Sequence, residues 1–123
     1  MRLTETLQRE AAAQDSYFMA QLAREDLARL EKLRALAKTV SDVESFKKAG
    51  SRVGWTAGDL RTGELREPLE RFLEAMYALE HASEPRGDTD AEAAVEAAWR
   101  DLHRARMERL LGCLSTPVPK PSA

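Results

Sequence analysis

Glycine placement constrains the fold of this chain more than any other feature of its sequence. Four of the six glycines (Gly50, Gly54, Gly58 and Gly63) fall in one short stretch around Trp55. Glycine permits backbone angles and close approaches that other residues resist, and irregular connectors of this kind often carry function. The segments on both sides read almost wholly as helix. We therefore predict two helical regions joined by a glycine-rich connector, in which Trp55 is either an anchor or a hot spot for a partner.

Length and composition indicate one soluble domain. A chain of 123 residues can bury its own core, so no disulfide or metal is needed for stability. Cys113 is the single cysteine, and no apolar run reaches the length of a signal peptide or a membrane span. Arginine outnumbers lysine and alanine is abundant, which suggests a GC-rich bacterial source. We expect a cytoplasmic protein with one domain over 1–115 and a disordered, proline-rich tail over 116–123.

The N-terminal third predicts a long helix from Thr4 to about Lys38, built from good helix formers. Whether it is continuous through Asp15 and Ser16 stays open. Its leucines recur at every third position and spread over about half of the helix surface, which is wider than a two-stranded seam. These leucines are Leu27, Leu30, Leu33 and Leu36. Such a helix needs two neighbours, which favours a bundle.

A capping box predicts the start of a short helix. Ser41 and Glu44 have the spacing at which serine and glutamate satisfy each other's open backbone donors, and the helix is expected to end near Gly50.

Two more long helices follow the connector. Pro68 is expected in the first turn of one, because proline is tolerated there and disfavoured deeper. A second capping box, Thr89 with Glu92, opens the other, which runs to about Leu114. The predicted fold is all-α: a bundle of three long helices plus one short helix and a glycine-rich connector.

Charge is segregated along the chain although the formal net charge is only −2. Residues 47–66 carry five basic residues against Asp59 and Glu64, whereas 67–98 carry nine acidic residues against Arg71 and Arg86. We expect these two segments to face one another within the molecule.

The sequence predicts no catalytic, cofactor-binding or metal-binding set. His81 and His103 lack the Glu-x-x-His spacing of di-iron bundles, and with Cys113 they match no zinc motif. The glycines match neither a dinucleotide-binding nor a P-loop pattern. His103 is expected to lie on a helix surface or at a bundle edge.

One segment resembles a helix-turn-helix core. Gly50, Gly54, Thr56 and Leu60 fill the small-residue, turn, helix-start and anchor positions of that motif. DNA binding through 46–66 would then use Arg52, Arg61 and Arg66 as phosphate contacts, with 57–62 facing the major groove. Against this, Gly58 and Gly63 would weaken the second helix.

Two functions therefore remain open. The first is a small non-enzymatic protein–protein interaction module, such as an adaptor, a chaperone-like protein or a regulatory subunit, that forms homodimers. Its interface candidates are Leu33, Leu36 and Trp55. The alternative is a DNA-binding transcriptional regulator that acts through 46–66.

Overall fold

The computed structural model describes residues 2–13, 17–53, 63–81 and 89–115, and these ranges form five helices without a strand. The helices are α1 (Arg2–Ala13), α2 (Tyr17–Thr39), α3 (Val43–Gly50), α4 (Gly63–Glu80) and α5 (Thr89–Ser115). The all-α prediction is confirmed. Within the described ranges, no helix has the length and apolar character to cross a bilayer.

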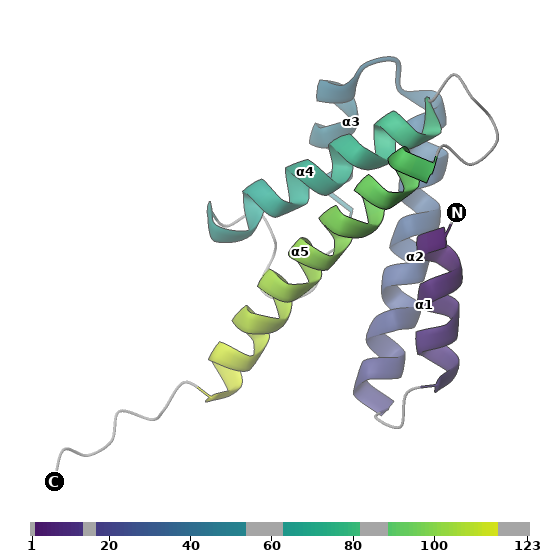
Figure 1. The fold of residues 1–123 in the computed structure, drawn as a ribbon. Coiled ribbons are helices and arrows are strands. Elements are labelled where there is room, and N and C mark those ends of the chain that lie inside the picture. The colour runs from purple at the N-terminus through teal and green to yellow at the C-terminus, as the bar shows by residue number, and fades with distance from the viewer. Residues whose placement is uncertain (1, 14–16, 54–62, 82–88, 116–123) are drawn as a thin grey trace, which may run out of the picture.

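The N-terminal third, whose continuity the sequence leaves open, forms two helices that lie side by side (Figure 1). Asp15 and Ser16 themselves lie outside the described residues. A continuous helix over 4–38 would be about 50 Å long and could not fold back on itself. As two helices, the segment buries Leu3 and Leu7 of α1 together with the leucines of α2. The bundle therefore has four longer helices and the short α3.

Neighbouring helices follow a cyclic order. α1 packs against α2 and α5, and α4 packs against α5 and α2, so that α2 and α5 lie across a diagonal. Among the described residues, no Cα atom of α2 comes within 8 Å of a Cα atom of α5. α3 covers α4 and α2 at the end where the helices converge, and the C-terminal part of α5 runs away from the α1–α2 pair (Figure 1).

The core follows alternating steps of three and four residues along each long helix, the spacing that keeps one face inward. The hydrophobic core cluster contains Leu30, Leu33 and Ala37 on α2, Leu65, Leu69, Phe72, Leu73 and Met76 on α4, and Val95, Trp99 and Leu102 on α5. Phe46 of α3 is also buried and contacts Tyr77 at a ring-centroid distance of 5.6 Å.

The predicted short helix is confirmed, but its cap is Asp42 instead of Ser41. The Asp42 carboxylate accepts a hydrogen bond from the Ser45 backbone N–H at 3.4 Å, so the N-cap lies one residue later than the capping box predicts. At the other end of α3, Gly50 is buried. A Cβ atom at this position would lie 2.9 Å from Leu73 Cδ2, which is closer than van der Waals contact. Gly50 therefore permits a close helix–helix approach.

Pro68 is not in the first turn of its helix. α4 begins at Gly63, which places Pro68 inside the helix. The additional turn is favoured because it buries Leu65 in the same core as Leu69. α5 begins at Thr89 and ends at Ser115, in agreement with the predicted boundaries. The predicted tail over 116–123 lies outside the described residues.

The expected attraction between the basic and acidic segments occurs at Lys47. Its ammonium lies 2.7 Å from Glu74 on α4 and 3.2 Å from Glu44 on its own helix. The hydrogen bond to Glu74 is the largest cause of a raised pKa of Lys47.

Candidate functional site

The predicted site residues that the structure describes come from different parts of the chain: Leu33 and Leu36 from α2, Arg52 from the residues after α3, and Arg66 from α4. Leu33 is 0% exposed and belongs to the core, so a partner could reach it only if the helices separated. Leu36 is half-buried against the same core. Trp55 and Arg61 lie outside the described residues. Arg52 and Arg66 are both exposed, and Arg66 lies 3.6 Å from Glu70.

The helix-turn-helix pattern is only partly covered by the structure. Gly50, which the pattern places within the first helix, is the last residue of α3. The second helix of the pattern would occupy positions outside the described residues.

A groove of 530 Å³ lies between α3 and α4, and we name it the α3–α4 groove. Leu69 forms its apolar floor, and charged side chains of both signs surround it. The lining residues are Glu44, Ser45, Lys47, Lys48, Ser51, Arg66, Leu69 and Glu70. Local sequence explains this arrangement, because residues at i, i+3 and i+4 share a helix face, as Glu44, Lys47 and Lys48 do on α3.

A buried polar cluster links α2 and α5 across the bundle diagonal, and it consists of Asp26, Arg29, His103 and Arg106. The Arg106 guanidinium donates two hydrogen bonds to the Asp26 carboxylate, at 2.7 and 2.6 Å. Arg29 Nη1 donates to Asp26 Oδ1 at 2.9 Å. Asp26 is 2% exposed and Arg106 is 0% exposed. A two-pronged pair of this kind fixes orientation as well as distance.

The spacing of the helices places these charges inside. Asp26 precedes Leu30 by four residues on α2, and Arg106 follows Leu102 by four residues on α5. Both positions continue the core face by one turn. No Cα atoms of α2 and α5 lie within 8 Å of each other among the described residues, and the long arginine side chain spans the distance to Asp26.

His103 is held as a neutral imidazole in this cluster. Its Nδ1 lies 3.0 Å from Arg106 Nη2, and since an arginine has only donors, Nδ1 must accept. The remaining proton of the neutral ring is then on Nε2. Burial lowers the pKa of His103, the positive charge of Arg106 lowers it further, and Asp26 opposes them. The ring also stacks on Trp99 at a centroid distance of 5.8 Å.

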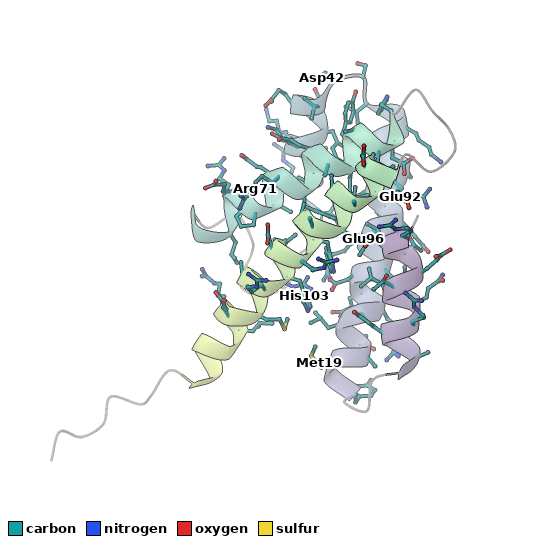
Figure 2. All side chains as sticks on the ribbon, viewed as in Figure 1. Met19, Asp42, Arg71, Glu92, Glu96 and His103 are labelled. Atoms are coloured by element: carbon teal, nitrogen blue, oxygen red, sulfur yellow. The ribbon has the colours of Figure 1, made fainter. Side chains whose placement is uncertain are left out.

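Two cavities adjoin His103. One, of 400 Å³, lies between α1 and α5, and we name it the α1–α5 groove. Its lining residues are Leu3, Thr6, Glu10, Glu96, Trp99, Arg100, His103 and Arg104. A smaller cavity of 90 Å³ lies between His103 and α2 and is also lined by Glu10. Figure 2 shows Glu96 and His103 on the side of α5 that faces α1 and α2.

Within the described ranges, no three His, Cys, Asp or Glu side chains are placed to hold an ion. The side chain of Cys113 is not described. Sequence reasoning missed Asp26 and Arg106 because 80 positions separate them along the chain. A charged residue that falls on the inward face of a helix was the signal that could have found them.

Comparison of this chain with protein-family models, with curated proteins and with solved structures finds no match. Function must therefore be argued from the geometry.

Proposed function

We propose that this chain is a small protein-binding module of the bacterial cytoplasm that receives its partner in the α3–α4 groove. It acts as an adaptor, a chaperone-like protein or a regulatory subunit, without enzymatic activity, and it forms a homodimer. The observation that supports protein binding is the mixed lining of the groove.

Three cations and two carboxylates surround the Leu69 floor, which suits a protein surface that carries both signs of charge. A DNA duplex presents negative charge on every phosphate. Glu44 and Glu70 would then face phosphates at close range, and their repulsion would offset the attraction of Lys48 and Arg66. The same groove therefore favours a protein over a duplex.

Polar side chains near His103 also support a non-enzymatic role. Arg106 is bound to Asp26, and the Nδ1 of His103 is occupied by Arg106. A general base needs a free acceptor atom within reach of a substrate proton, and this imidazole nitrogen is already engaged.

DNA binding through 46–66 is the second candidate, because Lys48, Arg52 and Arg66 are all exposed. A fluorescence-anisotropy titration against duplex DNA at about 50 and 200 mM salt distinguishes the two functions. We expect no binding at the lower salt. Tight binding that is lost at the higher salt would replace the protein-binding proposal.

The protein-binding proposal is tested with a photo-crosslinking amino acid at position 48, compared with the same amino acid at the exposed Lys32 on α2. In cells of the source organism we expect a discrete adduct from position 48 and none from position 32. The adduct should vanish when Arg66→Glu is added and persist when Arg71→Glu is added, since Arg71 is exposed on α4 outside the groove. Equal adducts from both positions would contradict the proposal.

Homodimer formation is tested separately by sedimentation of the purified chain, whose mass is 13.8 kDa. A mass twice that value supports the dimer, and a monomer at all concentrations contradicts it.

A further inference from the structure

The α1–α5 groove is a separate cavity with the size and the rigid wall of a ligand site. Its 400 Å³ falls within the roughly 300–1,000 Å³ typical of small-molecule pockets. Two of its apolar lining residues, Leu3 and Trp99, are 2% and 8% exposed. The Trp99 ring is held by Phe72 at a centroid distance of 5.3 Å and by the Arg106 guanidinium 5.3 Å from its centroid. A wall fixed in this way needs no rearrangement to receive a ligand.

The polar cluster leaves Nε2 as the donor atom of His103, a residue that lines this groove. Because His103 Nδ1 accepts from Arg106, Nε2 carries the proton of the neutral ring. Among the residues that the structure describes, no hydrogen bond is formed by His103 Nε2, and His103 lines the groove. The Asp26–Arg106 pair therefore presets a hydrogen-bond donor for a ligand that accepts.

Two arginines add positive charge along the same face of α5. Arg100 and Arg104 are one turn apart and both line the groove. The carboxylate of Glu96, which lies 4.0 Å from Arg100, is engaged by Arg2 at 2.6 Å. That hydrogen bond from Arg2 is also the largest cause of a lowered pKa of Glu96.

A single carboxylate on the α1 side limits the charge of the ligand. Glu10 lines the groove opposite the arginines and would repel a group with two negative charges, such as a phosphate monoester. A monoanion meets less repulsion from Glu10 than a dianion does. The apolar surfaces of Leu3 and Trp99 favour a ligand with an apolar body.

We propose that the α1–α5 groove binds a small organic monocarboxylate, whose apolar body packs on Leu3 and Trp99. Its carboxylate accepts hydrogen bonds from His103 Nε2 and from the guanidinium of Arg104. This site is independent of the protein-binding groove between α3 and α4.

The probe is phenylacetate, titrated into the full chain and followed by amide NMR shifts and calorimetry. Phenylacetamide and phenethylamine are matched probes with the same ring and a neutral or positive group. We expect phenylacetate to bind with a Kd on the order of 1 mM and the other two to bind at least about tenfold more weakly. Shifts should gather on α1 and α5 around Leu3 and His103.

Two variants test the named contacts. Arg104→Gln should weaken phenylacetate binding about tenfold, because it removes a charge-assisted hydrogen bond. His103→Asn places an amide oxygen near the position of Nδ1, which keeps an acceptor for Arg106, and removes the Nε2 donor. It should weaken binding by a similar factor, whereas Arg71→Gln should change nothing.

Three outcomes overturn the site: equal binding of phenylacetamide, preferred binding of phenethylamine, or no binding of any probe. Arg104 is exposed, so its variant stays folded even if His103→Asn does not. Lys48→Glu with Arg66→Glu should leave phenylacetate binding intact, which separates this test from that of the protein-binding groove.

Discussion

Removal of Arg106 from the buried polar cluster should destabilise the fold strongly. Arg106→Met keeps an unbranched apolar side chain but removes the guanidinium, so it leaves the Asp26 carboxylate, 2% exposed, without its two-pronged partner. Loss of one member of a buried ion pair costs about 3–5 kcal/mol. Arg29 still donates to Asp26 at 2.9 Å, which places the expected loss near the lower limit, at about 3 kcal/mol.

The Asp26–Arg106 ion pair as a whole should contribute much less to the unfolding free energy than the loss of Arg106 alone suggests. Arg106 Nε is buried without a hydrogen-bond partner in the described part of the chain, and an unsatisfied buried donor costs about 1–3 kcal/mol. Asp26→Leu with Arg106→Met removes both charges and this orphaned donor together. We therefore expect the unfolding free energy of the double variant to lie within about 1 kcal/mol of that of the parent.

Urea unfolding followed by far-ultraviolet circular dichroism measures both effects. The two single variants and the double variant form a thermodynamic cycle, whose coupling energy should exceed about 2 kcal/mol. If Arg106→Met lowered the unfolding free energy by less than about 1 kcal/mol, the unpaired buried charge of Asp26 would not be the main cause of destabilisation. Losses that simply add in the double variant would refute the pairing of Asp26 with Arg106.

Three further predictions concern the stability of the fold. Gly50→Ala should lower the unfolding free energy by about 1 kcal/mol in urea melts, since its Cβ would press on buried Leu73 Cδ2 at 2.9 Å and overpacking outweighs the gain in helix propensity; unchanged or raised stability would contradict that close approach. Asp42→Ala should cost about 1 kcal/mol in thermal melts through loss of the cap, whereas Ser41→Ala should stay within about 0.5 kcal/mol. A larger loss from Ser41→Ala than from Asp42→Ala would instead identify Ser41 as the N-cap, as the capping box predicts. Because the folded state lowers the pKa of His103, the unfolded chain binds its proton more tightly, so the unfolding free energy should decline as the pH falls below about 6.5; a pH series of urea midpoints checks this, and His103→Asn should remove that part of the slope.

Much of the architecture can be predicted from local sequence. Steps of three and four residues identify the inward faces of α4 and α5, because helical geometry places such residues on one side. Caps and end signals locate α3 and the start of α5, since they depend on residues within one turn of each other. Pro68 misleads because its local penalty is smaller than the gain from burying Leu65 one turn earlier.

The α3–α4 groove is predictable only in part. Lys48 and Arg66 belong to a basic stretch that is visible in the sequence. That Glu44 and Glu70 line the same groove depends on how α3 docks against α4. This docking places charges of both signs in one groove, and the proposal of a protein partner rests on that mixture.

By itself the sequence determined that the chain is helical, where most of its helices end and which faces turn inward. These properties depend on residues a few positions apart. Only the tertiary structure decided that Asp26 meets Arg106, because 80 positions separate them and no local pattern encodes that distance. It also decided that His103 is a neutral donor beside a cavity, since its protonation depends on a guanidinium held by another helix.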